Sequence, residues 1–247
     1  GDDTFFGSAD SETIESHGGD DVVYGYDGND EIFGGAGSDE LYGGDGDDAI
    51  NDDNEGGTYD PWGVPYGDDT IDGGSGNDSL IAYRGSDTVI GGTGDDLIGV
   101  YDFDDTVDGG ADTDTLYMLL NTLTSGVTLD FTDLLSGGSL VVGTGSITGI
   151  ERLGDGTNFN SSTMTDFDDS VIIPVSYMFD VDFDLGHGND YMTSGSGDDI
   201  IDGYYEDDII YGNDGDDELF GNYGDDQLFG GNGNDALADG AGGTNTM

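Results

Sequence analysis

The sequence predicts an all-β solenoid, in which short repeats stack along one axis. The first observation is a period of nine, because an acidic residue recurs at every ninth position through three blocks of six units. The second is that the residue two positions after each of these acids is apolar, although only 33% of the chain is hydrophobic. The third is a glycine-rich stretch before each acid, where a chain can turn tightly. Such self-similarity at a fixed short period is typical of stacked β-repeats.

The acidic positions define the register of the repeat. The unit is G-G-x-G-x-D-x-U-x, where U is a large apolar residue, and we number its places one to nine, so that the acid stands at place six. The place-six acids are Asp3, Glu12, Asp21, Asp30, Asp39, Asp48, Asp69, Asp78, Asp87, Asp96, Asp105, Asp114, Asp190, Asp199, Asp208, Asp217, Asp226 and Asp235.

Each unit divides into a turn and a very short strand. Glycine at places one, two and four allows positive φ and lets backbone carbonyls converge, because no Cβ stands in the way. The apolar residue at place eight points inward and its neighbours at places seven and nine point outward, since side chains alternate along a strand. We therefore expect a narrow core with one large side chain from every unit.

Three units show the pattern most clearly. They are Gly34-Gly35-Ala36-Gly37-Ser38-Asp39-Glu40-Leu41, Gly73-Gly74-Ser75-Gly76-Asn77-Asp78-Ser79-Leu80 and Gly230-Gly231-Asn232-Gly233-Asn234-Asp235-Ala236-Leu237. On these motifs the chain resembles the RTX (repeats-in-toxin) family of calcium-binding parallel β-rolls. The resemblance implies a right-handed parallel β-roll, a β-helix-like solenoid with calcium ions in its stacked turns. Two units would form one coil of eighteen residues, and successive coils would stack about 4.8 Å apart.

The stacked acids would then repel one another unless a cation lies between them. Ca²⁺ takes about six to eight oxygen ligands and tolerates irregular geometry, whereas the turns offer no Cys and almost no His for zinc or copper. Mg²⁺ would have to shed water that it holds tightly. By the resemblance, each calcium ion lies between two stacked turns and is bound by carbonyls and place-six carboxylates. We expect roughly a dozen or more ions in the chain.

The resemblance assigns these ligands residue by residue. Carboxylate ligands are expected at Asp3, Asp21, Asp30, Asp39, Asp48, Asp69, Asp78, Asp87, Asp96, Asp190, Asp199, Asp217, Asp226 and Asp235. Carbonyl ligands are expected at Gly28, Gly35, Gly37, Gly44, Gly46, Gly74, Gly76, Gly92, Gly94, Gly197, Gly215, Gly224, Gly231 and Gly233. Weaker metal candidates are Asp105, Asp114, Asp169 and Asp208.

Departures from the motif explain the weaker group. Phe103, Asp112 and Glu206 replace the place-four glycine before Asp105, Asp114 and Asp208. Glu12 lacks the glycines of places two and four, where Ser8 and Asp10 stand. We expect these turns to bind calcium weakly or not at all.

The charge of the chain restricts its partners. It has 57 Asp and Glu against 2 Lys and Arg, so its formal net charge is −55 at pH 7. A chain of this charge is not expected to bind nucleic acid or anionic membranes. There is no Cys, which fits an extracellular protein without disulfides, and no apolar stretch approaches the roughly 20 residues of a membrane span.

Interruptions divide the chain into blocks. Asp48 and Asp69 are 21 residues apart, one unit plus 12 residues, which predicts a loop inserted at 52–66. Residues 118–166 lose the period and resemble the connector between RTX blocks. We expect β-roll blocks at 1–117 and 167–247, joined by a non-calcium β connector at 118–166 that carries the sheet onward; a small separate domain is the alternative. Residues 168–171 are expected to add a seventh turn to the last block.

The sequence offers little for catalysis. It contains no H-E-x-x-H, no G-x-S-x-G and no phosphate-binding loop, and its two histidines, His17 and His187, are 170 residues apart. We therefore expect no enzymatic activity in this chain. Because the chain starts inside a repeat, we expect it to be a processed product or a fragment.

Three functions stay open. The first is a structural module that folds on calcium outside the cell and assembles with itself at a cell surface, as in a surface layer, adhesin or filament. The second is the secretion and folding tail of an RTX enzyme or toxin, and the third is a carbohydrate- or surface-binding module. Outward aromatic residues at place nine favour self-assembly: Phe6, Tyr24, Tyr42, Tyr211 and Phe229. The resemblance implies a bacterial protein that leaves the cell by type I secretion.

Overall fold

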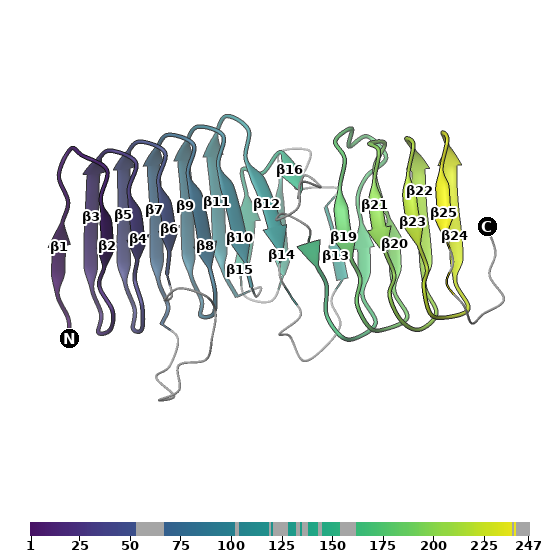
Figure 1. Cartoon of the computed structure of the whole chain (residues 1–247), viewed down its shortest axis with the longest axis horizontal. Helices are drawn as coiled ribbons and strands as arrows, with labels where there is room; N and C mark the ends of the chain where they lie inside the picture. Colours follow the sequence, from purple (N-terminus) through teal and green to yellow (C-terminus); the bar gives the residue numbers. More distant parts are fainter. Residues whose placement is uncertain are drawn as a thin grey trace. The chain divides into compact units, whose positions relative to one another are not determined.

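The computed structural model confirms the all-β class. It describes residues 1–52, 67–101, 104–118, 120, 128–131, 134, 138–142, 145–153, 162–238 and 240 (Figure 1). These residues contain 25 short strands and no α-helix. None of them belongs to a helix that is long and apolar enough to cross a membrane.

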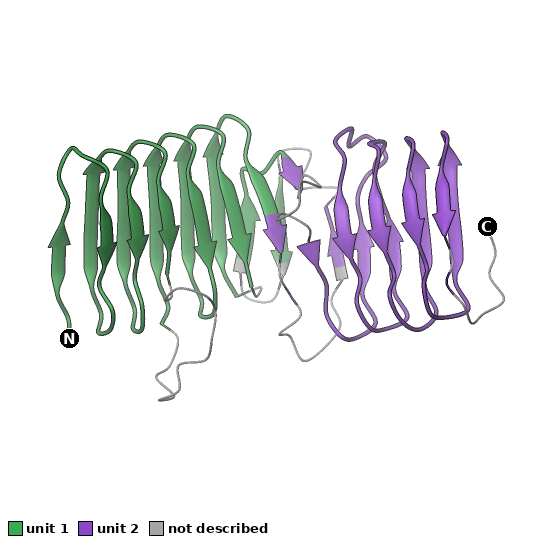
Figure 2. Cartoon of the chain, viewed as in Figure 1, with its two compact units in different colours: residues 1–116, 137–151 green, residues 117–136, 152–247 purple. Residues whose placement is uncertain are grey.

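The chain forms two compact units (Figure 2). The first comprises residues 1–116 and 137–151, and the second comprises residues 117–136 and 152–247. The aperiodic segment 118–166 thus contributes to both units, in addition to the two blocks of repeats.

The first unit consists of parallel strands that alternate between two sheets. One sheet has the order β1–β3–β5–β7–β9–β11–β15–β14, and the other contains β12–β10–β8–β6–β4–β2. The strands are β1 (Thr4–Phe6), β2 (Thr13–Glu15), β3 (Val22–Asp27), β4 (Glu31–Phe33), β5 (Glu40–Asp45), β6 (Ala49–Asn51), β7 (Thr70–Ser75), β8 (Ser79–Ala82), β9 (Thr88–Thr93), β10 (Leu97–Val100), β11 (Thr106–Ala111), β14 (Ser139–Val142) and β15 (Gly145–Thr148). Strand β12 (Thr115–Met118) begins in this unit.

The second unit repeats this arrangement. Its sheets have the orders β13–β18–β20–β22–β24 and β17–β19–β21–β23–β25. The strands are β13 (Thr128–Asp130), β16 (Arg152–Leu153), β17 (Ser162–Thr163), β18 (Ser170–Ile172), β19 (Asp182–Asp184), β20 (Tyr191–Thr193), β21 (Ile200–Asp202), β22 (Ile209–Asp214), β23 (Glu218–Phe220), β24 (Gln227–Asn232) and β25 (Ala236–Ala238).

The register of the strands follows the repeat. Val23 pairs with Leu41, eighteen residues later, as a coil of two units requires. Leu41 pairs with Ile71, thirty residues later, so the twelve extra residues leave the stacking intact. The inserted loop itself, including Trp62, lies outside the described residues.

The place-eight residues form the core. They are fully buried in all but the outermost strands β1, β2 and β25, where Phe5, Ile14 and Leu237 are half-buried. Alternation along each strand thus orients place eight inward and leaves places seven and nine on the outer face.

Strand β14 departs from the parallel coils that we expected for the connector. Strand β15 extends the sheet in parallel, with Val107 beside Ile147, but β14 pairs with β15 in the antiparallel direction. Only two residues separate β14 from β15. A connection this short permits a hairpin and not a parallel crossover, which needs about a dozen residues.

Candidate metal centre

The place-six carboxylates are buried and aligned along the stack. In each coil, the Oδ1 atom of the place-six Asp accepts a hydrogen bond from the place-six backbone N–H of the preceding coil. Asp39 Oδ1 accepts from Asp21 N–H at 2.8 Å, and Asp48 Oδ1 accepts from Asp30 N–H at 2.8 Å. The exposed fraction of these four residues is at most 2%. One oxygen of each carboxylate therefore joins two coils.

These bonds form four columns, which we call the place-six ladders. Two run through the first unit, from Asp3 to Asp105 and from Glu12 to Asp114, and two run through the second, from Asp169 to Asp226 and from Val181 to Asp235. Their N–O distances lie between 2.6 and 3.3 Å. The same position in the ladders is held by Asp69, Asp87, Asp105 and Asp208.

The second carboxylate oxygen of many of these residues has no protein partner. The Oδ2 atom is buried without a hydrogen bond in Asp21, Asp30, Asp39, Asp48, Asp78, Asp96, Asp114, Asp190, Asp199, Asp208 and Asp217. A buried carboxylate oxygen without a donor is costly unless a cation is bound.

The Oδ2 atoms lie against backbone carbonyls of the following coil. At Gly34, an added Cβ would lie 2.7 Å from Asp39 Oδ2 and 2.6 Å from the carbonyl oxygen of Asp52. Both distances are shorter than those of real Cβ contacts. The same pair of oxygens, a place-six Oδ2 and a place-one carbonyl, flanks Gly25, Gly43, Gly73 and Gly91. A side chain at these five glycines would therefore meet two oxygens.

Carbonyls at places two and four point toward the following coil. Gly46 has φ of +141°, and its Cα faces the carbonyl oxygen of Gly28. Carbonyls of expected ligands face the next coil in the same way at Gly28, Gly37, Gly44, Gly46, Gly74, Gly76, Gly92, Gly197 and Gly215. Positive φ is also found at Gly35, Gly94, Gly231 and Gly233. Carbonyls at places two and four therefore face the following coil, and a place-one carbonyl and a carboxylate oxygen meet at place one.

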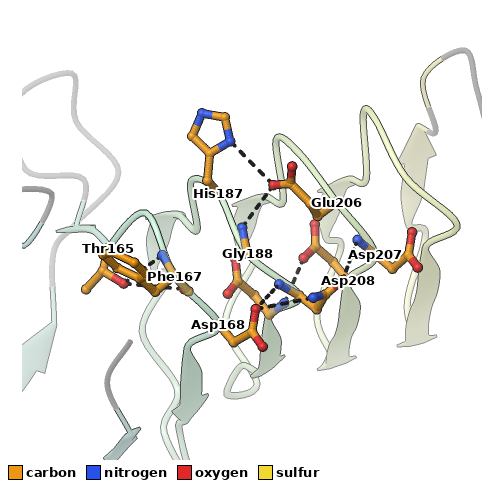
Figure 3. Close-up of polar contacts among 10 residues, drawn as sticks. Thr165, Phe167, Asp168, His187, Gly188, Glu206, Asp207 and Asp208 are labelled. Carbon is orange, nitrogen blue, oxygen red and sulfur yellow. Dashed lines mark hydrogen bonds and ion pairs between the residues drawn. The ribbon is translucent and has the colours of Figure 1, made fainter. Parts of the chain in front are cut away.

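The turn keeps its shape where glycine is replaced. Asp112 and Glu206, both at place four, have φ of 88° and 72°. The carbonyl oxygen of Glu206 faces Gly224 in the next coil, as a glycine carbonyl would. Its side chain points back to the preceding coil, where Oε2 accepts from Gly188 N–H at 3.1 Å and lies 3.4 Å from His187 Nδ1 (Figure 3). The backbone of this turn thus offers the same carbonyls as the complete turns.

Asp169 differs from the other place-six residues. Both its carboxylate oxygens accept from Thr165, with Oδ2 at 2.8 Å from the backbone nitrogen and Oδ1 at 2.9 Å from Oγ1. Both oxygens of this carboxylate therefore have hydrogen-bond donors within its own turn.

The donor set fits calcium. Every group that turns into the space between coils is an oxygen, carboxylate or carbonyl, and the geometry is irregular, as Ca²⁺ tolerates. Burial raises the pKa of Asp78 and Asp190 to about 7 and that of Asp208 to about 8, and neighbouring carboxylates add to the rise. A divalent cation would relieve both the desolvation and the repulsion.

Several contributing groups were not predicted from the sequence. The place-one carbonyls are one set. Glu151 is another, because its Oε2 accepts from Asp114 N–H at 3.0 Å and continues the ladder of the first unit. The signal was present, since Leu153 follows Glu151 by two positions, as in every repeat. Asp52 is the third, because its carboxylate lies within 4.8 Å of those of Asp69 and Asp87.

Place five forms a second ladder of hydrogen bonds, in which the donor and the acceptor coil are exchanged relative to the place-six ladders. Here the side chain of one coil accepts from the place-five N–H of the following coil. Asp47 Oδ1 accepts from Asn77 N–H at 2.9 Å, and Asn77 Oδ1 accepts from Asp95 N–H at 2.9 Å. This explains why place five is so often Asp, Asn or Ser, each of which has a short acceptor side chain.

A pair of variants tests the ranking of the sites. We expect Asp39→Ala to weaken calcium binding at two adjacent sites by about tenfold or more, because it removes a charged ligand and a bond to Asp21 N–H. Glu12→Ala is the matched control at the same place. Both Glu12 carboxylate oxygens already bond to Ser8, so we expect little change. Calcium titrations in which the two variants behave alike would contradict the ranking.

Comparison with known proteins adds to this geometry. Six segments match the family model of the RTX calcium-binding nonapeptide repeat, which holds four copies of the unit: residues 1–23, 24–51, 66–98, 101–117, 184–204 and 202–237. Together they cover more than half of the chain and contain all eighteen place-six acids of the sequence. A search of curated proteins found no match.

Proposed function

Because the chain belongs to the family of RTX calcium-binding nonapeptide repeats, and is therefore a calcium-binding repeat module, we propose that it is an extracellular structural protein. It folds when it meets millimolar calcium outside the cell and then associates with itself at a cell surface. The place-six ladders carry the first part of this proposal, since their buried carboxylates need a cation that cytosol supplies only at very low concentration.

The ligands are proposed as the sequence assigns them, with additions from the structure. Place-six carboxylates from Asp3 to Asp235 and carbonyls at places two and four bind the ions, and the place-one carbonyls join them. Asp114 and Asp208 are proposed as full ligands, because their Oδ2 atoms are as buried and as unpartnered as those in complete turns.

The outer aromatic columns support self-association. In the first unit, Phe6 stacks on Tyr24 and Tyr24 on Tyr42, with ring centroids 5.6 and 5.0 Å apart. In the second unit, Tyr211 stacks on Phe229 at 4.5 Å. Phe6 has 65% of its surface exposed. Calcium has two roles in this proposal, since it builds the coils and also lowers the negative charge that separates two copies.

Sedimentation velocity in millimolar calcium tests self-association. We expect oligomers whose fraction rises with protein concentration. The triple variant Phe6→Thr, Tyr24→Thr, Tyr42→Thr should shift the protein toward monomer. Ile90→Thr is the matched control, because Ile90 stands at place nine of the same sheet, is 36% exposed and lies outside the column.

A parent protein that stays monomeric at high concentration would contradict self-association. That result would favour a folding tail of a larger secreted protein. It would leave calcium binding untouched, because the ladders are internal to each unit.

A further inference from the structure

The second unit contains a cleft outside the place-six ladders. Its volume is about 270 Å³, and three successive coils line it. The lining includes Met164 and Asp166 from the first of these coils, Asp184 and His187 from the second, and Tyr204 and Tyr205 from the third. None of these side chains was assigned to calcium.

Aromatic rings form one side of the cleft. His187 and Tyr205, both at place three, stack with ring centroids 4.4 Å apart and an angle of 7° between planes. Tyr205 stacks in turn on Tyr223 at 5.2 Å. Tyr204 stands beside this column, 6.3 Å from the Tyr205 ring and tilted by 33°. Tyr204 and Tyr205 keep 42% and 40% of their surface exposed.

Carboxylates also line the cleft. Asp184 is half-buried on the outer face of β19, and burial and its neighbour Asp182 raise the pKa of its carboxyl group. Asp202 Oδ1 accepts a hydrogen bond from Tyr204 N–H at 3.0 Å, and the charges of Asp184 and Asp202 raise the pKa of the Tyr204 phenol. Of the side chains that line the cleft, His187 alone can carry a positive charge. The cleft is therefore electronegative and walled by rings.

Tyr204 stands at place two of its unit and adopts φ of 68° there. Glycine holds this place in eight of the units, whereas His17, Tyr26, Asn213 and Asn222 hold it elsewhere with φ between 66° and 82°. A hydrogen bond from Tyr204 N–H to Asp202 Oδ1, of 3.0 Å, helps to hold this conformation. This conformation costs a tyrosine more than a glycine, and the hydrogen bond to Asp202 offsets part of that cost. The ring of Tyr204 lines the cleft.

We propose that this cleft binds the quaternary ammonium head of a small organic cation, of the choline type. Aromatic faces attract such a head through its methyl groups, and nearby carboxylates balance its charge. A metal ion gains little from ring faces and prefers the oxygen-only spaces between coils. A primary ammonium would need three acceptors in fixed directions, whereas rings form much of this wall.

The test uses the calcium-loaded full chain and choline chloride as the probe. In the His17→Asn background the remaining histidine is His187, so its ring protons report the cleft by NMR. We expect a saturable shift of the His187 signal with choline. The neutral isostere 3,3-dimethylbutan-1-ol has the same shape without the charge and should cause no comparable shift.

Two variants locate the site. Tyr204→Gly removes one ring and places the repeat's own residue at place two, so the turn is kept; we expect it to weaken choline binding by about two- to thirty-fold. Asp184→Asn removes one charge at nearly constant volume and should also weaken binding. Tyr26→Gly in the first unit is the matched control, since Tyr26 is also at place two with φ of 82°. It should bind choline like the parent.

Each opposite result overturns the proposal. The absence of a saturable shift would exclude the site, and equal binding of the neutral isostere would show an apolar cleft without preference for cations. Tighter binding of Nα-acetyl-lysine methylamide than of choline would exclude the quaternary head. Unchanged affinity in both Tyr204→Gly and Asp184→Asn would place the ligand elsewhere. None of these results bears on calcium binding or self-association.

Discussion

In calcium-free buffer at pH 7, the chain is expected to lose most of its β-structure and to regain it when millimolar calcium is added. The formal charge of −55 is spread through turns that stack on one another, and the two basic residues cannot balance it. Each unit buries one large apolar side chain, while its glycines lose more conformational freedom on folding than any other residue. Without cations, burial of the place-six carboxylates opposes folding.

Circular dichroism measures this effect. A titration of calcium into protein kept in EGTA should show a cooperative rise of the β-signal, and the same concentration of Mg²⁺ should give much less, because Mg²⁺ holds its water more tightly. A full β-spectrum in EGTA at pH 7 would contradict the prediction. The expected change is nearly the whole spectrum, since each proposed ion would lie between coils and no coil can stack without its neighbours.

Much of this fold follows from the sequence because a single unit is repeated. The period of nine predicts the strand and the inward residue, and with the coil of two units that the resemblance implies it also predicts the pairing of Val23 with Leu41. The antiparallel pairing of β14 with β15 could not, because apolar residues at alternating positions predict a strand and not its direction.

The candidate site shows the same division. Place-six acids and carbonyl glycines stand at invariant places of the unit, so they could be predicted. The hydrogen bond that Oδ1 makes to the neighbouring coil could not be predicted, because it depends on the side-chain rotamer that the stacked coils allow. The cleft beside His187 depends on place three, which the unit leaves variable, and on place two, where Tyr204 replaces glycine. Tyr205 stands eighteen residues after His187, so a coil of two units predicts that their rings meet, and the structure pairs these two residues. The cleft that they line could not be predicted.

In calcium-free solution, acid should partly replace calcium. Burial raises the pKa of the folded carboxyl groups, to about 6 for Asp39 and Asp217, about 7 for Asp78 and Asp199, and about 8 for Asp208. The ordinary value is 3.8. A group whose pKa is raised by folding binds a proton more tightly in the folded state, so protonation favours folding. This contribution is complete below about pH 4 and disappears as the pH rises through 6 to 8.

We therefore expect the β-signal in EGTA to grow as the pH falls from 8 to 4, and the calcium concentration at the folding midpoint to fall over the same range, because protonation already stabilises the folded state. The affinity of the folded chain for calcium should decrease, since protons and calcium compete for the same oxygens. Asp208→Asn separates the two effects, since an amide imitates the protonated acid but is a poorer calcium ligand. In EGTA at pH 8, this variant should be more folded than the parent. In calcium it should need more of the ion, because one charged ligand is missing from two adjacent turns.

Asp216→Asn, at place five, is the matched control, since its exposed side chain bonds to Asn234 N–H and stands outside the place-six ladder. A parent whose folding in EGTA is independent of pH, or an Asp208→Asn variant that is less folded than the parent in both conditions, would show that charge repulsion is not what keeps the apo chain open.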